Sequence, residues 1–198
     1  MKSGHAALLP LTRCQYESTS ALTPAIDGYL HFLRGLMTAA AIDAAIHGIG
    51  GPAHKLTVFS DAFWKPQAPL LRGFGIVAFI AFLPNGSTVY APVVVPQELL
   101  ALFGEREKYI NPLETLALCG TYFSLPINSF AGCAILHFGD NTGANFGAIR
   151  GYSPCHDVGL MLLAFNLRIA IAGARPHIDF VPTAQNIADL PTKSTDPE

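Results

Sequence analysis

Hydrophobic positions in the first quarter of the chain recur at spacings of three and four residues. Pro24 stands where a helix can begin, with Thr23 as its N-cap. The pattern predicts an amphipathic helix over residues 24–47, preceded by a poorly specified tail and followed by a Gly/Pro hinge near residues 48–55. The apolar positions of this helix are Ile26, Leu30, Leu33, Met37 and Ala41.

Three β-rich segments follow the hinge. The segments LTVFSDA (56–62), GFGIVAFIAFL (73–83) and STVYAPVVV (87–95) are rich in β-branched and aromatic residues. The turn sequence Pro-Asn-Gly at 84–86 lies between the last two and indicates a hairpin. The pattern therefore predicts three consecutive strands in meander order.

The remainder of the chain alternates between helical and strand patterns. A helix is predicted over 111–125, with Asn111 as its cap and Pro112 at its first position. The elements predicted after it are a strand over 133–140, a short helix over 141–151, a long helix over 157–172, a strand over 177–182 and a short helix over 186–191.

This order of elements predicts an α/β fold with a five-stranded mixed sheet flanked by helices. We expect the first three strands to be antiparallel and the last two to run parallel to the first. The hinge places the domain boundary after residue 54, so that residues 1–54 form an N-terminal tail and helical appendage and residues 55–198 the main domain.

Composition adds two expectations about partners. Charged residues make up only 13% of the 198 residues and hydrophobic residues 51%, with a mean hydropathy of +0.36, so we expect a surface that contacts other protein subunits. The net charge of −2 counts against a protein that holds a nucleic acid unaided.

Composition also bears on the compartment. No apolar stretch reaches the ~18 residues of a membrane span. The four cysteines form no CxxC pair, which favours reduced thiols over a zinc site or disulfides. We therefore expect an intracellular protein of the cytoplasm or nucleus. An organelle is the alternative, since the first 16 residues contain Lys2 and Arg13 but no acid.

Four of the 14 acidic residues lie in separate short motifs: Asp61 in VFSDA, Glu114 in NPLET, Asp140 in HFGDN and Asp189 in NIADLP. We expect Asp61 and Asp140 at the carboxyl ends of neighbouring parallel strands, where open α/β sheets bind ligands. Glu114 is expected in the first turn of its helix and Asp189 on the last short helix. Carboxylates are the ligands that Mg²⁺ prefers, and a metal pair ~3.5–4 Å apart stabilises the attacking and leaving oxygens of a phosphodiester.

Each of these acids also has a structural interpretation. Glu114 lies three residues after Asn111 and could be the distant arm of a capping box. Asp140 could be the N-cap of the next helix, Asp61 a turn residue and Asp189 an exposed acid of a first helical turn. These interpretations do not predict the alternation of strand acid and helix acid along the chain.

Residues from about 56 to 194 resemble the ribonuclease H domain attached to the reverse transcriptases of retroelements. The resemblance is carried by VFSDA, YINPLETLAL, LHFGDNTGANFGAIRGYS and IDFVPTAQNIADLPTK, the last of which matches the form V-P-S-x-x-N-x-A-D-x-P-S-R. It implies the RNase H-like fold and a module of a reverse transcriptase that works beside a polymerase domain. It also implies cleavage of the RNA strand of an RNA–DNA hybrid with two Mg²⁺ ions, for which Mn²⁺ substitutes. The acids Asp61, Glu114, Asp140 and Asp189 then take the catalytic and metal-binding roles.

The chain departs from the family pattern at Thr192-Lys193, where the motif has Ser-Arg, and it contains few basic residues to hold a hybrid. His177 is a candidate proton shuttle, because the pKa of histidine lies near neutrality; the alternative is a solvent-facing histidine at a strand edge. The candidate contacts with nucleic acid are Asn141, Arg150, Arg175, Asn186 and Lys193.

Two functions of different classes remain open at this point. The first is a metal-dependent endonuclease that belongs to a larger polymerase. The second is a domesticated, catalytically inactive copy that serves as a structural or RNA-contacting subunit, which the apolar, weakly charged composition favours. A related integrase or junction resolvase shares the fold, but the helix with Glu114 and the N-x-A-D ending fit ribonuclease H better.

Overall fold

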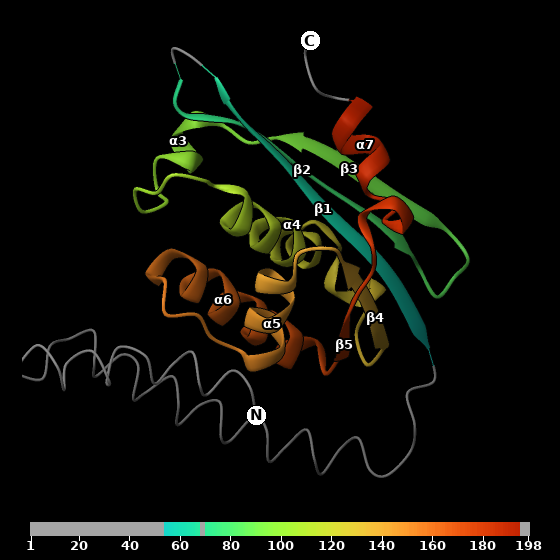
Figure 1. Cartoon of the computed structure of the whole chain (residues 1–198). Helices are drawn as coiled ribbons and strands as arrows, with labels where there is room; N and C mark the ends of the chain where they lie inside the picture. Colours follow the sequence, from blue (N-terminus) through green and yellow to red (C-terminus); the bar gives the residue numbers. More distant parts are fainter. Residues whose placement is uncertain (1–53, 68–69, 195–198) are drawn as a thin grey trace, which may run out of the picture.

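The computed structural model describes residues 54–67 and 70–194, which form an α/β unit around one five-stranded sheet (Figure 1). The helix predicted over 24–47 and almost all of the predicted appendage lie outside these residues. The strands are β1 (Lys55–Gln67), β2 (Leu70–Phe82), β3 (Thr88–Val94), β4 (Ala134–Gly139) and β5 (Arg175–Phe180). The helices are α3 (Gln97–Leu100), α4 (Ile110–Ser124), α5 (Thr142–Arg150), α6 (His156–Ala172) and α7 (Asp189–Ser194), with 3₁₀ turns at Ile127–Ser129 and Thr183–Gln185.

The strand order is β3-β2-β1-β4-β5. β1, β2 and β3 pair antiparallel, while β4 pairs parallel with β1 and β5 parallel with β4. The predicted mixed sheet is therefore confirmed. No helix among the described residues is long and apolar enough to cross a membrane.

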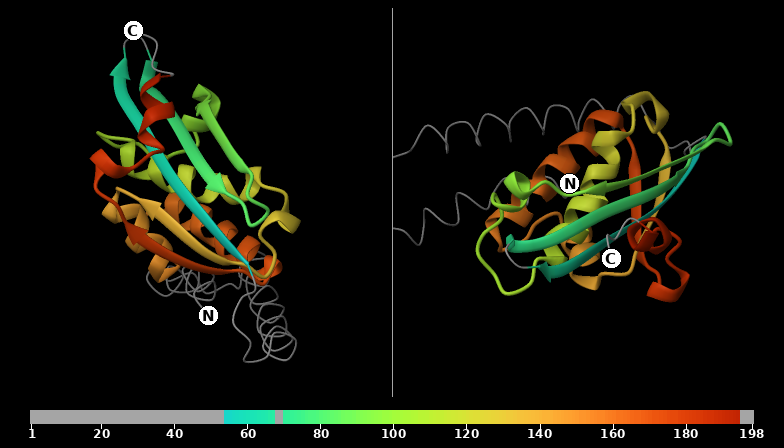
Figure 2. Two further views of the ribbon diagram at one scale, coloured as in Figure 1. Left: turned by 90° about the vertical axis from the view of Figure 1, so that its right-hand side faces the viewer. Right: turned by 90° about the horizontal axis from the view of Figure 1, so that it is seen from above.

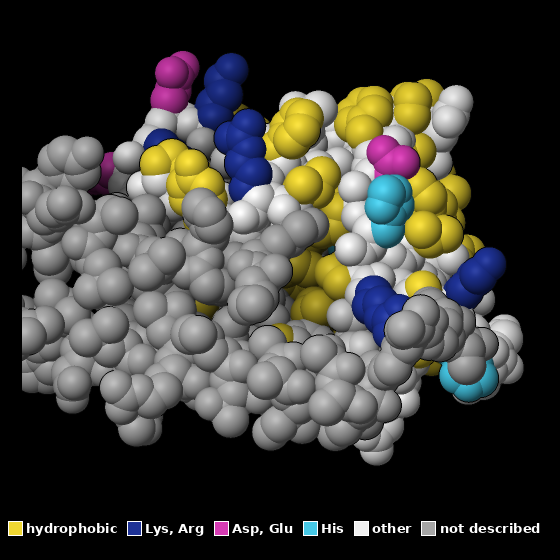
Figure 3. Space-filling model, turned by 90° about the horizontal axis from the view of Figure 1, so that it is seen from below, with side chains coloured by type: hydrophobic (Ala, Val, Ile, Leu, Met, Phe, Trp, Pro, Cys, Tyr) yellow, Lys and Arg dark blue, Asp and Glu magenta, His cyan; other side chains and the backbone are white. Residues whose placement is uncertain are grey.

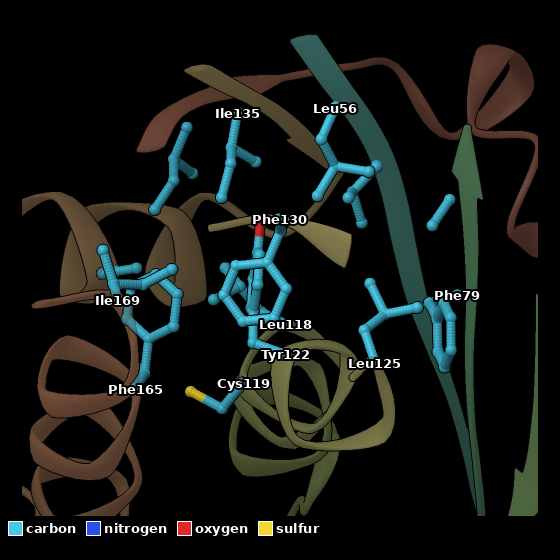
Figure 4. Packing of buried hydrophobic residues seen from close by; sticks show 14 of the residues in the cluster. Leu56, Phe79, Leu118, Cys119, Tyr122, Leu125, Phe130, Ile135, Phe165 and Ile169 are labelled. Atoms are coloured by element: carbon cyan, nitrogen blue, oxygen red, sulfur yellow. The ribbon is translucent and has the colours of Figure 1, made fainter. Parts of the chain in front are cut away.

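Helices α4, α5 and α6 cover one face of the sheet, and α7 lies against the other face, on β1, β2 and β3 (Figure 2). Side chains alternate between the faces of a strand, so Leu56 and Val58 of β1 enter the core on the α4 side while Asp61 points to the α7 side. In that core, the rings of Tyr122, Phe130 and Phe165 pack between α4, α6 and the sheet (Figure 4). Each buried ring contributes about 1.5–3 kcal/mol to folding.

Two local predictions around the site are wrong. Asp61 does not end its strand, because β1 continues beyond the predicted segment 56–62 to Gln67 in a long hairpin with β2. The next two residues, Phe63 and Trp64, are good strand formers. Asn111 is not the N-cap of α4: the helix begins at Ile110, and Tyr109 occupies the cap position without a side-chain hydrogen bond.

Two proline-containing boundaries also differ from the prediction. β5 begins at Arg175 instead of His177, because an edge strand tolerates Pro176 in the ladder. The last helix covers 189–194 instead of 186–191, since Pro191 falls in its first turn, where a backbone N–H has no helical partner to lose. The short helix α3 was not predicted.

Candidate metal centre

Three carboxylates from three elements meet at one point of the sheet. One oxygen each of Asp61, Glu114 and Asp140 lie within 4.8 Å of one another. The parallel ladder between β1 and β4 ends at the pair Phe59–Phe138. Asp61 lies two residues after Phe59 in β1, and Asp140 lies two residues after Phe138, immediately after the end of β4. The two aspartates therefore meet where the ladder stops.

Glu114 approaches from the opposite side of the sheet. It lies in the second turn of α4, which packs on β1 and β2, and its side chain is only 6% exposed. The backbone N–H of Ala62 donates a hydrogen bond to its carboxylate. Because Asn111 does not cap α4, the capping-box interpretation of Glu114 is wrong. The prediction that Glu114 lies in the first turn of its helix is also wrong, because α4 begins at Ile110 and Glu114 is in its second turn.

Burial makes this cluster costly to ionise. The pKa of Asp61 is raised to about 6, mainly by desolvation and in addition by the charges of Asp140 and Asp189, against a hydrogen bond from Thr192 that lowers it. Burial and the charges of Asp61 and Asp140 raise the pKa of Glu114 well above its usual value. A buried set of oxygen ligands that repel one another suits a hard divalent cation such as Mg²⁺.

The C-terminal segment holds Asp61. The hydroxyl of Thr192 lies 2.6 Å from Oδ2 of Asp61, and Nδ2 of Asn186 donates to Oδ1 of Asp61 at 3.3 Å and to the carbonyl of Ser60 at 3.0 Å. Both residues are buried, with exposed fractions of 0% and 3%. We therefore propose that Asn186 holds Asp61 instead of contacting a nucleic acid.

Sequence reasoning missed the role of Thr192, which we noted only as a departure from the serine of the family motif. The signal was present, because threonine and serine share the hydroxyl group at this position.

Asp189 lies near the cluster but outside the group of three. It begins α7, and its Oδ2 accepts a hydrogen bond from Nζ of Lys193 at 2.5 Å. Its charge nevertheless raises the pKa of Asp61. The role of Asp189 as a fourth ligand remains a proposal, which requires its carboxylate to turn from Lys193 toward the cluster.

Asp140 lies immediately before the N-terminus of α5, where two asparagine side chains have defined positions. Oδ1 of Asn141 accepts a hydrogen bond from the N–H of Ala144 at 3.0 Å, so Asn141 is the N-cap of α5 and the capping interpretation of Asp140 is wrong. Oδ1 of Asn111 is buried and has no hydrogen-bond partner among the described residues. A Cβ at Gly143 would lie 2.8 Å from that oxygen, so a larger residue here would displace the Asn111 side chain. An unpaired acceptor thus lies beside the start of α5.

Three other predicted residues lie away from the cluster. Arg150 is exposed at the last turn of α5, with its guanidinium 5.7 Å from the ring centre of Phe146. Arg175 pairs with Ala134 at the start of β4, the end of the strand that is remote from Asp140. His177 is exposed and pairs with Leu136 of β4. Leu136 precedes Asp140 by four residues, which is about 13 Å along a strand. The structure does not bring these side chains to the carboxylates, and the shuttle role of His177 stays a prediction.

A buried hydrogen-bonded network includes Ser60, the residue before Asp61. Nε2 of His137 is 2.8 Å from the hydroxyl of Ser60, and its Nδ1 is 2.7 Å from the hydroxyl of Tyr122. The three residues come from β4, β1 and α4, the same elements that supply or precede the three carboxylates. His137 is completely buried, and desolvation lowers its pKa to about 3.

Fold and site together define an RNase H-fold domain with a buried cluster of acids. Two solved structures share the fold. The N-terminal RNase H domain of a Mycobacterium tuberculosis protein, solved as a fusion with maltose-binding protein, superposes with a TM-score of 0.50 at 12% identity over 72% of this chain and 96% of that one. An RNase H1 isolated from compost by a metagenomic approach gives 0.52 at 12% identity over 71% and 94%. No protein-family model matches the sequence, and no curated protein is significantly similar to it.

Proposed function

We propose that this chain is a metal-dependent endonuclease that hydrolyses the RNA strand of RNA–DNA hybrids. The observation that supports it most is the convergence of Asp61, Glu114 and Asp140 within 4.8 Å, from three elements of an RNase H fold. The proposal extends to the cofactor: two Mg²⁺ ions, with Mn²⁺ as a substitute, held by these three residues and by Asp189.

The residues of the chain have defined tasks in this reaction. Asp61, Glu114 and Asp140 bind the cations, which supply electrostatic stabilisation of the charge that develops on the attacking and leaving oxygens of the phosphodiester. Thr192 and Asn186 keep Asp61 in place. Lys193 pairs with Asp189, and Asp189 would have to turn away from it to bind a cation as the fourth ligand. Burial excludes bulk water, which strengthens the attraction between carboxylates and cations.

We further propose that the chain acts beside other protein, as a module of a reverse transcriptase. The motif resemblance supports the polymerase context, and the apolar surface supports a protein partner. On the α7 side of the sheet, Phe82, Tyr90 and Leu136 are 42%, 68% and 38% exposed, next to the stacked rings of Phe59 and Phe138. Figure 3 shows hydrophobic side chains gathered on the part of the lower surface that the described residues form. Such a surface is typical of a protein contact.

The test is cleavage of a labelled RNA–DNA hybrid by the purified chain in Mg²⁺ or Mn²⁺, with duplex RNA and duplex DNA as comparison substrates. We expect metal-dependent cleavage of the hybrid RNA strand only, and its loss in EDTA and in Asp140→Asn. Cleavage of duplex DNA would instead assign the site to a nuclease of the integrase or resolvase kind.

The second candidate function is that of an inactive, structural or RNA-contacting subunit, which the exposed apolar side chains favour. Folded protein that cleaves no hybrid in either metal, and that purifies natively in a stable multi-subunit complex, would support this function and contradict the nuclease.

A further inference from the structure

The hydroxyl of Thr192 stands between two acids of the site. It lies 2.6 Å from Oδ2 of Asp61 and 2.9 Å from the backbone carbonyl of Asp189. A hydroxyl has one proton to donate, and a bond to an ionised carboxylate is shorter and stronger than one to a neutral carbonyl. The distances agree with donation to Asp61, so Thr192 links the carboxylate cluster to the first turn of α7.

Asp61 needs such a link, because it faces like charges in a buried place. Its side chain is 4% exposed and lies within 4.8 Å of the oxygens of Glu114 and Asp140. Repulsion favours rotation of the Asp61 carboxylate away from both. Hydrogen bonds from Thr192 to one oxygen and from Asn186 to the other oppose that rotation.

The two donors leave room for a cation. A carboxylate has about four lone-pair positions, and Thr192 and Asn186 each use one, on different oxygens. The remaining lone pairs are free for a metal ligand bond. Of the two hydrogen bonds, the one from Thr192 is the shorter, at 2.6 Å against 3.3 Å, so it contributes more to the orientation.

We propose that Thr192 is a positioning residue of the metal site: its hydroxyl holds the carboxylate of Asp61 in the orientation in which it binds a divalent cation together with Glu114 and Asp140. This inference rests on the proposed function, because it takes the cluster to be a cation site. Residues that orient metal ligands typically change metal affinity or activity 10–100-fold when they are replaced.

Thr192→Val tests this, because valine keeps the branched shape and removes the hydroxyl. We expect Mn²⁺ affinity of the substrate-free protein, measured from the electron paramagnetic resonance signal of free Mn²⁺, to fall about 10–100-fold. Thr192→Ser restores most of the affinity, since serine returns the hydroxyl. Thr121→Val is the matched control: Thr121 is equally buried, and its hydroxyl donates to the carbonyl of Ala117 within α4, away from the cluster.

The outcomes separate the inference from the proposed function. Folded Thr192→Val with wild-type Mn²⁺ affinity overturns the inference, as does an equal loss in Thr121→Val. If wild type binds Mn²⁺ and the serine and valine variants behave as expected, the inference stands even where no hybrid is cleaved, and only the proposed substrate fails. A wild-type chain that binds no Mn²⁺ overturns both.

Discussion

Glu114→Gln is expected to abolish hybrid cleavage while raising the melting temperature of the metal-free protein. Glutamine keeps the size of the side chain but loses the charge that binds a cation. A loss of about 4 kcal/mol of transition-state stabilisation corresponds to a rate lower by about 10³-fold. The measurements are single-turnover cleavage of a hybrid in Mg²⁺ and thermal unfolding in EDTA.

The gain in stability follows from the raised pKa values. An acid whose pKa is higher in the folded state contributes stability at low pH and loses it as the pH rises through the folded value. The raised pKa values of Glu114 and Asp61 therefore mean that ionising the cluster at pH 7.5 costs stability in the absence of a cation. Glu114→Gln removes one ionisable carboxyl and relieves that cost, so the variant melts higher than wild type at pH 7.5. The difference in melting temperature disappears near pH 4, where Glu114 of the wild-type protein is protonated.

A matched control for this variant is Glu98→Gln, which changes an exposed acid in the first turn of α3 that lies outside the acidic group found among the described residues. It should alter neither cleavage nor the response of the melting temperature to Mn²⁺. A Glu114→Gln variant that melts below wild type in EDTA would contradict the electrostatic cost, and one that cleaves normally would remove Glu114 from the site.

His137→Ala is expected to destabilise the protein by about 3–5 kcal/mol at pH 7, because it leaves a cavity and deprives two buried hydroxyls of their partner. Those hydroxyls belong to Ser60 and Tyr122, which come from different elements. Chemical denaturation of metal-free protein measures the difference in unfolding free energy. Leu136→Ala, a change at the neighbouring and 38% exposed position, is the control and should cost much less.

The pH dependence gives a second, independent measure of this residue. The pKa of His137 is lowered to about 3 in the folded protein, so its contribution to stability is complete above the unfolded pKa of about 6.5 and is lost as the pH falls toward 3. The difference between wild type and His137→Ala should therefore shrink by about 1.4 kcal/mol for each pH unit below 6.5. A difference that stays constant between pH 7 and pH 4.5 would contradict a buried neutral histidine.

Much of the architecture followed from local patterns. The runs of β-branched and aromatic residues and the Pro-Asn-Gly turn predicted the meander of β1, β2 and β3, because strand propensity and turn chemistry act over a few residues. Boundaries failed where the deciding partner is distant: β1 extends beyond Asp61 because β2 pairs with it as far as Gln67, and β5 starts at Arg175 because Ala134 pairs with it.

By itself, the sequence determined the fold class and singled out four acids in short motifs, of which the structure brings Asp61, Glu114 and Asp140 within 4.8 Å of one another. Only the tertiary structure decided how those acids are held. The contacts of Thr192 and Asn186 with Asp61 span 131 and 125 residues, and His137 joins Ser60 across 77. Such contacts depend on how β1, β4 and α7 pack in space, and hydrophobic periodicity describes only the face that each element buries.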